Sequence, residues 1–220
     1  MVTKVTSQPD LSLERAQFDL GATVVGAVDE VGRGSLAGPV SIGLVLLNAA
    51  TANVMPPAGI KDSKQLSAIA RAGLAPQIKL WALAAVVAHA SAAEIDKLGI
   101  IGALRLATHR ALAAVKRQCT VDVLLLDGTH DWLTGPATMP RVVMQVKGDQ
   151  TSIGIAAASI IAKHERDQLM AQLAPQHPEY EWANNKGYAS SGHMSALVQY
   201  GPTKLHRRSW NLNFMEKEKV

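Results

Sequence analysis

The sequence predicts an α/β fold, in which helices pack on a five-stranded sheet and a short helical part follows at the C-terminal end. Three observations support this fold class. Five runs of strand length are apolar or β-branched, longer segments carry apolar residues three or four positions apart, and strands alternate with helices after an opening hairpin. The chain of 220 residues suffices for one sizeable core, so we expect one domain spanning residues 1–220.

Each expected strand is a short apolar run bounded by turn signals. Residues 23–31 and 40–47 flank a glycine-containing turn and are predicted to form a hairpin. Three further strands are expected at residues 81–90, 121–126 and 142–146. An acid follows each of the last two within three residues, Asp127 and Asp149 respectively. Two strands therefore deliver carboxylates to their ends.

The helices are indicated by apolar spacing and by end signals. Ser67 can cap a helix that Pro76 disturbs or ends. Residues 100–115 carry apolar side chains on one face, and residues 152–173 have the alanine-rich composition of a long helix. The remaining segments are a shorter helix and two loops, expected at residues 192–199, 60–67 and 175–185 respectively.

Four acids stand at the ends of predicted strands: Asp29, Glu30, Asp127 and Asp149. An unpaired carboxylate beside a hydrophobic core is costly, so such a group needs a compensating partner, and a divalent cation supplies one. Oxygen ligands without Cys or His ligand spacing favour Mg²⁺ or Mn²⁺ over zinc. Two such ions about 4 Å apart can activate a water and stabilise the leaving oxygen of a phosphodiester.

Each acid also has a purely structural interpretation. Asp127 with the following glycine can form a turn, Asp149 can cap a helix, and Asp29 can bind a loop amide. Neighbours on a regular strand point to opposite faces, so Asp29 and Glu30 reach one ion only if the strand twists or ends there. The glycines that follow favour such an ending. Periodicity alone leaves both interpretations open.

The formal net charge is +4, and one C-terminal segment alone carries four uncompensated cations. Residues 186–210 contain no acid and carry Lys186, Lys204, Arg207 and Arg208. Their neighbours include three aromatic residues, Tyr188, Tyr200 and Trp210. This mixture predicts a basic surface suited to phosphate contact and to stacking on sugars or bases. The alternative is a solvated face whose aromatic rings pack inward.

The composition argues against several classes of protein. Hydrophobic residues make up 48% and charged residues 18%, which disfavours disorder. Neither a secretion signal nor an apolar stretch of membrane-spanning length is visible in the sequence. We therefore expect a cytoplasmic protein that does not enter a membrane. Cys119 has no thiol partner or ligand spacing and is interpreted as an ordinary residue.

A series of ordered motifs resembles the signature of the ribonuclease HII family. The motifs run from about Gly26 to Trp210, and together they are highly specific. They are Asp29-Glu30-Val31-Gly32-Arg33-Gly34 with Leu36-Ala37-Gly38-Pro39-Val40, Asp62-Ser63-Lys64-Gln65-Leu66, Leu126-Asp127-Gly128, Lys147-Gly148-Asp149, Ala158-Ser159-Ile160-Ile161-Ala162-Lys163 with Arg166-Asp167, Lys186-Gly187-Tyr188, and Tyr200-Gly201-Pro202-Thr203 with His206-Arg207.

The resemblance implies a ribonuclease H-like mixed sheet, with a core at about residues 22–175 and a C-terminal helical part at about residues 176–212 that helps to grip a duplex. It also implies an endonuclease that hydrolyses the RNA strand of RNA/DNA hybrids and nicks 5′ of single ribonucleotides in duplex DNA, leaving 3′-hydroxyl and 5′-phosphate ends. The implied cofactors are two Mn²⁺ or Mg²⁺ ions, and the implied partners are these nucleic acids. We expect a monomer.

Site residues follow from the resemblance by position. It makes the four acids, Asp29, Glu30, Asp127 and Asp149, the catalytic metal ligands. Gly32, Arg33 and Gly34 match the family's glycine-arginine-glycine run. The glycines would let the backbone approach a ribose 2′-hydroxyl, and Arg33 would bind a phosphate through its planar fork.

Three more residues are candidates for substrate contact. Tyr188 matches the tyrosine that packs on the deoxyribose beyond the ribonucleotide, with a buried core tyrosine as the alternative. Lys64 is expected to contact phosphate, and Lys163 is a further candidate for that role or faces solvent. His193 and His206 match family positions, and we assign neither a catalytic role.

The chain departs from the family pattern at a few positions. Ser35 stands where proline is usual and Gly99 where asparagine is frequent, while Thr129 and His164 replace other residue types. None of these changes removes a carboxylate, so they bear on substrate preference. The alternative functions are a ribonuclease HIII-like hybrid nuclease, against which Arg33 and the short N-terminal segment argue, and a non-catalytic nucleic-acid-binding protein.

Overall fold

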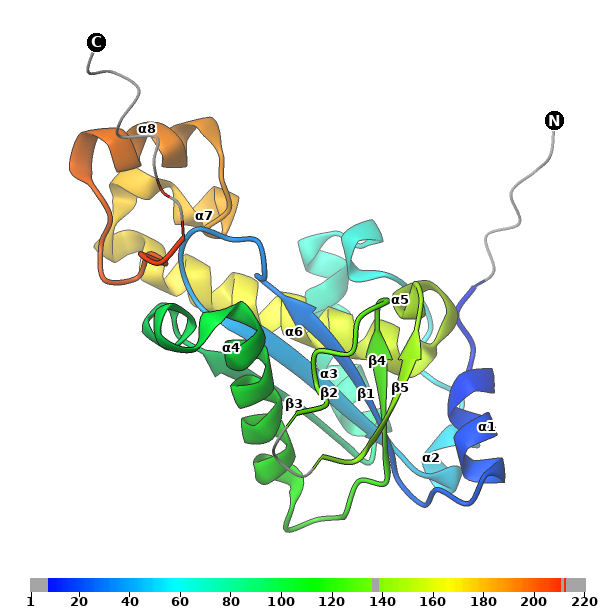
Figure 1. Cartoon of the computed structure of the whole chain (residues 1–220). Coiled ribbons are helices and arrows are strands. Elements are labelled where there is room, and N and C mark those ends of the chain that lie inside the picture. The colour runs from blue at the N-terminus through cyan, green and yellow to red at the C-terminus, as the bar shows by residue number, and fades with distance from the viewer. Residues whose placement is uncertain (1–7, 136–138, 211, 213–220) are drawn as a thin grey trace, which may run out of the picture.

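The computed structural model describes residues 8–135, 139–210 and 212, and its centre is a five-stranded sheet (Figure 1). Residues 1–7 and 213–220 lie outside this description, so the prediction about a secretion signal, which rests partly on the first of them, is not tested by it. The strands are β1 (Val25–Val31), β2 (Val40–Leu47), β3 (Ala84–Ala90), β4 (Val123–Asp127) and β5 (Arg141–Gln145), in the spatial order β3-β2-β1-β4-β5.

The sheet is mixed. The pairs β1 with β2 and β2 with β3 are antiparallel, whereas β1 with β4 and β4 with β5 are parallel. The predicted mixed five-stranded sheet is thereby confirmed. A parallel pair brings the carboxyl ends of two strands to the same edge of a sheet. The ends of β1 and β4 are therefore neighbours, although the strands are far apart in the sequence.

Helices cover both faces of this sheet (Figure 1). One face is packed against α4, and the other against α3 and α6. The α-helices are α1 (Ser12–Asp19), α2 (Ala49–Ala52), α3 (Ala68–Trp81), α4 (Ala92–Val115), α5 (Gly148–Thr151), α6 (Ile153–Leu173), α7 (Trp182–Asn185) and α8 (Ser191–Tyr200). Short 3₁₀ turns lie at Ser63–Gln65, Ala174–Gln176 and Pro178–Tyr180.

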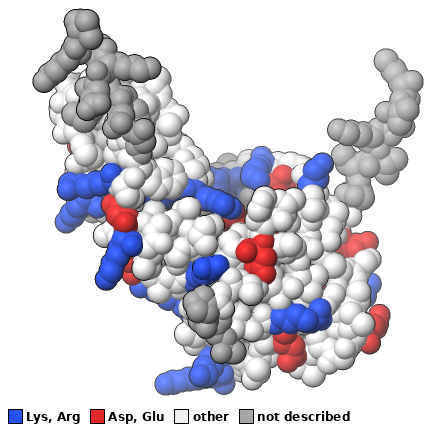
Figure 2. All heavy atoms as spheres, in the orientation of Figure 1, with Lys and Arg blue, Asp and Glu red and all other residues white. Residues whose placement is uncertain are grey.

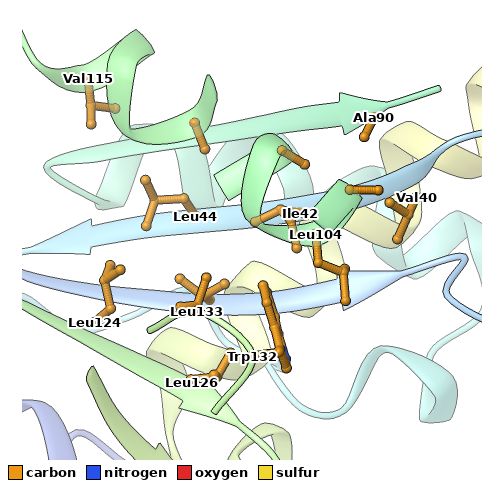
Figure 3. Packing of buried hydrophobic residues seen from close by; sticks show 14 of the residues in the cluster. Val40, Ile42, Leu44, Ala90, Leu104, Val115, Leu124, Leu126, Trp132 and Leu133 are labelled. Carbon is orange, nitrogen blue, oxygen red and sulfur yellow. The ribbon is translucent and has the colours of Figure 1, made fainter. Parts of the chain in front are cut away.

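The larger core cluster lies between the sheet and α4 (Figure 3). Ile42 and Leu44 of β2, Leu124 of β4 and Leu104 of α4 all belong to this cluster, and all four side chains are fully buried. This packing also settles how α4 is to be interpreted. Within the described residues α4 is the helix long and apolar enough to cross a membrane. Its buried apolar residues, however, pack against the sheet in the core cluster.

The chain's last helices form a separate layer on the distal half of α6. A cluster of buried residues, with Met170 of α6 and Tyr180, Trp182 and Leu197 of the C-terminal segment, holds them there. Tyr180 and Trp182 stack with ring centroids 5.4 Å apart. The expected C-terminal helical extension is present, and the segment predicted as a loop at residues 175–185 is wrong in part, because it contains two 3₁₀ turns and α7.

One helix was missed and two further local predictions were wrong. The helix α1 was not predicted, because its inward-facing residues include Glu14 and Gln17 rather than an apolar stripe. Pro76 does not end α3, which continues to Trp81 while burying Leu74 and Ile78. Strands and helices also do not alternate throughout, since β5 follows β4 without an intervening helix in the described residues.

The close contact between β2 and α6 predicts that a methyl group added at Gly43 lowers the stability of the protein. A Cβ atom built on Gly43 would lie 2.2 Å from the carbonyl oxygen of Ala158, so α6 would have to move away from the sheet. We expect Gly43→Ala to lower the free energy of unfolding by about 1–3 kcal/mol, measured by urea denaturation.

Gly73→Ala in α3 is the matched control. Nothing lies within 4 Å of a Cβ atom at Gly73, so alanine there should stabilise the helix by about 0.5–1 kcal/mol. Equal urea midpoints for the two variants would contradict the close approach of α6 to β2.

Candidate active site

The end of the β1–β4 pair brings two carboxylates together. The register pairs Val28 with Leu126, so the next residues, Asp29 and Asp127, lie side by side on the two strands. Asp29 is opposite Gly43 of β2, which faces α6, and therefore both acids lie on the α6 face of the sheet. Asp29 is 9% exposed. These two predicted site residues are thus neighbours, with Asp29 buried and Asp127 partly buried.

Glu30 follows Asp29 on the strand and accordingly turns away from that face. Its Oε1 lies 3.4 Å from Nη1 of Arg33 in a partly exposed ion pair. Burial raises the pKa of Glu30 above its ordinary value, Arg33 opposes this rise, and the charge of Asp127 adds to it. Glu30 is therefore close enough to feel Asp127, although its carboxylate is held by Arg33.

Asp149 reaches the same region from α5. The N–H of Gly148 donates to Oδ1 of Asp127 at 2.7 Å, which ties the start of α5 to the end of β4. Burial, with the nearby charges of Asp127 and Asp62, raises the pKa of Asp149 to about 6. Nζ of Lys64 lies 3.8 Å from its Oδ2. The structure thus places Lys64 beside an acid of the site.

Asp29 carries the largest electrostatic strain of the four predicted acids. Burial raises its pKa to about 8, and the charges of Glu30 and Asp127 add to the rise. A hydrogen bond from Ser159 on α6 partly offsets it. A carboxylate with such a pKa is one for which the fold supplies too little positive charge.

The donor set suits a hard divalent cation. It consists of carboxylate oxygens, and a cation of charge two would relieve the repulsion that raises the pKa of Asp29. In the side-chain positions of this structure, however, no three His, Cys, Asp or Glu residues lie close enough together to hold one metal ion in residues 8–135, 139–210 and 212. Asp29 and Asp127 lie side by side, whereas Glu30 forms an ion pair with Arg33 and Asp149 forms one with Lys64.

The glycine-arginine-glycine turn lies directly beyond these acids. Gly32 has φ +81°, and a Cβ atom there would lie 2.1 Å from Nε of Arg166, so glycine is needed for packing within the protein. Gly34 differs, since nothing lies within 4 Å of a Cβ atom built on it. The open face of the turn is therefore at Gly34, beside the exposed Arg33.

Tyr188 lies against this turn. Its hydroxyl accepts the N–H of Gly32 at 3.2 Å, and its half-buried ring lies 5.5 Å from the guanidinium carbon of Arg166. Nζ of Lys163 is 5.9 Å from the same ring and pairs with Asp167 at 2.6 Å. Lys163 is thus next to Tyr188 but already has an acidic partner.

Two residues of the site were not predicted, Asp62 and Ser159. Asp62 is buried, accepts the N–H of Lys64 at 2.9 Å and raises the pKa of Asp149. Ser159 lowers the pKa of Asp29, and its hydroxyl lies 2.7 Å from the hydroxyl of Ser63 in the Lys64 loop. Both stand in quoted motifs, but their side chains were not assigned because hydroxyl and turn residues have common structural roles.

The predicted basic surface is only partly correct. Lys and Arg side chains line the junction between the C-terminal helices and the core (Figure 2). Arg208 and Lys204 are exposed, but Arg207 is fully buried, so it adds no surface charge. Trp210 packs on the core with its ring 4.8 Å from the Arg207 guanidinium carbon, as the inward-packing alternative expected.

His193 and His206 form a fixed hydrogen-bond chain. Nδ1 of His206 accepts the N–H of Thr203, so its proton is on Nε2, which donates to Nε2 of His193 at 3.0 Å. His193 then donates from Nδ1 to the carbonyl oxygen of Tyr188 at 2.9 Å. Burial, with the neighbouring imidazole, lowers the pKa of His206 to about 4. Both rings are neutral supports for the Tyr188 backbone.

Taken together, the mixed sheet, the carboxylates at the end of a parallel strand pair and the adjoining glycine-rich turn define a ribonuclease H-like nuclease. The comparisons are more specific. The family model described as Ribonuclease HII matches residues 26–213, and the chain belongs to the ribonuclease HII family. It is an endonuclease, and family membership implies that it depends on divalent metal ions. The ribonuclease HIII-like and non-catalytic alternatives are therefore set aside.

Individual relatives cover nearly the whole chain. The ribonuclease HII of a Ruegeria species is 48% identical over 202 residues, covering 92% of this chain and 84% of that protein. That of Streptomyces avermitilis is 43% identical over 203 residues, covering 92% and 83%. The crystal structure of the ribonuclease H2 from Pyrococcus horikoshii OT3 is similar with a TM-score of 0.69 at 25% identity, covering 86% of this chain and 95% of that chain.

The raised pKa of Asp29 predicts an effect of pH on stability. An unfolded Asp titrates near 3.8 and the folded Asp29 at about 8, so between these values the folded state holds the extra proton. Stability attributable to Asp29 therefore falls as the pH rises through this range. We expect metal-free Asp29→Asn to melt above the wild type at about pH 9 and to lose most of that advantage at about pH 5, by calorimetry.

Asp122→Asn is the control of opposite sign. The hydroxyl of Thr23 and two backbone N–H groups lower the pKa of Asp122, so its charge stabilises the fold above that pKa. This variant should melt below the wild type at both pH values. An advantage of Asp29→Asn that did not grow with pH would contradict a protonated, buried Asp29.

Proposed function

We propose that this enzyme hydrolyses the RNA strand of RNA/DNA hybrids and nicks duplex DNA on the 5′ side of a single embedded ribonucleotide, leaving 3′-hydroxyl and 5′-phosphate ends. The observation that carries the proposal is the pair Asp29 and Asp127 at the end of two parallel strands, directly beside the turn from Gly32 to Gly34. The acids supply the cleavage centre, and the turn supplies a place for the nucleotide.

In this proposal Asp29, Glu30, Asp127 and Asp149 hold two divalent ions, Mg²⁺ or Mn²⁺. Such ions lower the pKa of water and neutralise charge that develops on a phosphate. The protein's own part is to bring the four carboxylates into one region, where the bound ions would favour their ionised forms. Glu30 and Asp149 would exchange Arg33 and Lys64 for the ions, which frees both cations to contact the phosphates of the substrate.

The nucleotide would be held by the turn and by Tyr188. Gly34 has open space where a side chain would stand, so a ribose can approach the backbone there. The ring of Tyr188 would pack on the sugar that follows, and Lys163 would support a neighbouring phosphate. Lys204 and Arg208 add exposed positive charge for the duplex. We propose that the enzyme acts as a monomer in the cytoplasm.

One assay tests the central proposal. A DNA duplex with one ribonucleotide and an RNA/DNA hybrid are incubated with Mg²⁺, Mn²⁺ or EDTA, and the products are mapped to the nucleotide on denaturing gels. We expect a nick 5′ of the ribonucleotide with either ion and none with EDTA. Cleavage 3′ of the ribonucleotide, or of an all-DNA duplex at a similar rate, would contradict the proposal.

The role of the acids predicts a separation of cleavage from binding. Asp127→Asn keeps the size of the side chain but removes a metal-binding charge, so the cleavage rate should fall by at least about 100-fold while hybrid binding is kept. Asp122→Asn, at the other end of the same strand, should cleave at nearly the wild-type rate at a temperature where it is folded. Normal cleavage by Asp127→Asn would exclude this residue as a ligand.

Tyr188 gives a graded prediction. Tyr188→Phe loses only the hydrogen bond to the N–H of Gly32, so the rate on the single-ribonucleotide duplex should fall about threefold. Tyr188→Ala also loses the ring and should slow this substrate more than a long hybrid. Leu80→Ala, whose side chain is 87% exposed on α3, is the control and should change neither rate. Equal rates for Tyr188→Ala and the wild type would remove the stacking role.

A further inference from the structure

Two arginines are fully buried behind the glycine-rich turn. Arg166 of α6 and Arg207 of the C-terminal segment are both 0% exposed. Neither forms an ion pair with any acid in the part of the chain that the structure describes. Burial, with the nearby charge of Arg166, lowers the pKa of Arg207 to about 9, so it stays charged at neutral pH. Two buried cations without a carboxylate are costly, and such an arrangement needs a reason.

Their hydrogen bonds converge on one short loop, residues 32–39. Arg207 donates to the carbonyl oxygens of Gly32, Arg33 and Gly38, at 2.5, 2.8 and 3.3 Å. Arg166 donates to Ala37 and Pro39, at 3.2 and 2.9 Å. Its remaining partners are the carbonyl oxygen of Lys186 at 3.0 Å and the hydroxyl of Ser35 at 2.7 Å.

The two guanidinium groups thereby polarise the loop. Its carbonyl oxygens are drawn inward to the arginines, whereas the N–H groups of Arg33 and Gly34 take part in no hydrogen bond within the described residues. Both residues are exposed. Adjacent free N–H groups with positive charge behind them form a donor surface that suits an oxygen acceptor. That surface lies at the open face of Gly34.

The sequence of the loop fits this arrangement. Arg166 occupies the place that a side chain on Gly32 would need, and Met170 does the same at Gly38, where φ is +78°. Ser35 adds a hydroxyl that accepts from Arg166, a contact that a proline at this position lacks. The departure from the family pattern at Ser35 thus adds one hydrogen bond between Arg166 and the loop in this chain.

We propose that Arg166 and Arg207 are positioning residues for ribose recognition, which hold the loop carbonyls inward so that the N–H groups of Arg33 and Gly34 meet the 2′-hydroxyl of the ribonucleotide. This inference rests on the proposed function, because it assumes that the loop reads that hydroxyl. A lysine at either position keeps the charge but has no planar fork to hold several carbonyls at fixed angles.

The test compares variants on matched duplexes. The KM for a DNA duplex with one ribonucleotide is measured together with the inhibition constant of the all-DNA duplex of the same sequence, which lacks the 2′-hydroxyl. For Arg207→Lys and Arg166→Lys we expect KM to rise about tenfold and the inhibition constant to stay within about twofold. Ser35→Ala, which removes one hydrogen bond of Arg166, should shift KM about threefold in the same direction.

Arg105→Lys is the matched control. The Arg105 guanidinium also donates to carbonyl oxygens, of Trp132 and Thr134 at 2.8 Å, but on another loop. It should lower thermal stability without changing the ratio of KM to the inhibition constant. Should the arginine variants not fold, Ser35→Ala decides the question. An unchanged ratio in Ser35→Ala and in every folded arginine variant would overturn the proposal.

Gly34→Ala separates this inference from the proposed function. Its Cβ atom has free space in the protein, so the fold is kept, but it would stand where the ribose approaches. If Gly34→Ala raises KM for the ribonucleotide duplex while Arg207→Lys behaves like Arg105→Lys, only the role of the arginines is wrong. If Gly34→Ala leaves KM unchanged, the reading of the 2′-hydroxyl by this loop is itself wrong.

Discussion

The parallel pairing of β1 with β4 is the constraint on which the rest of the molecule depends. It sets Asp29 beside Asp127 on a face that α6 covers, so two like charges meet where little water can screen them. Packing alone would favour apolar residues at this edge. The fold instead keeps carboxylates there and tolerates a pKa for Asp29 of about 8, which is the electrostatic signature of a functional site.

The neighbouring loop carries the opposite imbalance. Arg166 and Arg207 are buried among carbonyl oxygens without an acid, while Asp29 is buried without a base. The buried acid and the buried arginines lie on either side of the turn at Gly32, and no ion pair joins them within the described residues. In the function proposed above, divalent ions would compensate the carboxylates, whereas the arginines are already satisfied by the carbonyl oxygens of the loop.

The sequence contained enough to predict the sheet, because apolar runs of strand length are set by burial on both faces. It also located the acids, since carboxylates at the ends of such runs are unusual. The helix α1 escaped because its buried contacts are polar: Glu14 accepts from Ser152 and the N–H of Gly154. A search for hydrophobic periodicity cannot detect a helix whose buried contacts are hydrogen bonds of this kind.

Charge patterning failed for a related reason. Arg207 was counted as surface charge, yet its partners are backbone carbonyls of a loop far away in the chain, and no sequence pattern reports those. The orientation of Glu30 was also beyond prediction in detail, since it depends on where β1 ends and on the ion pair with Arg33. Tertiary contacts, rather than local preferences, decided both cases.

The distance in sequence between β1 and β4 has a consequence for synthesis. On the ribosome the strand with Asp29 is made early, but its partner strand emerges only after β2, β3 and α4. Non-local pairs form late because the intervening chain must first be closed into a loop. Until β4 has emerged, Asp29 has no second carboxylate beside it, so the paired acids form only late in synthesis.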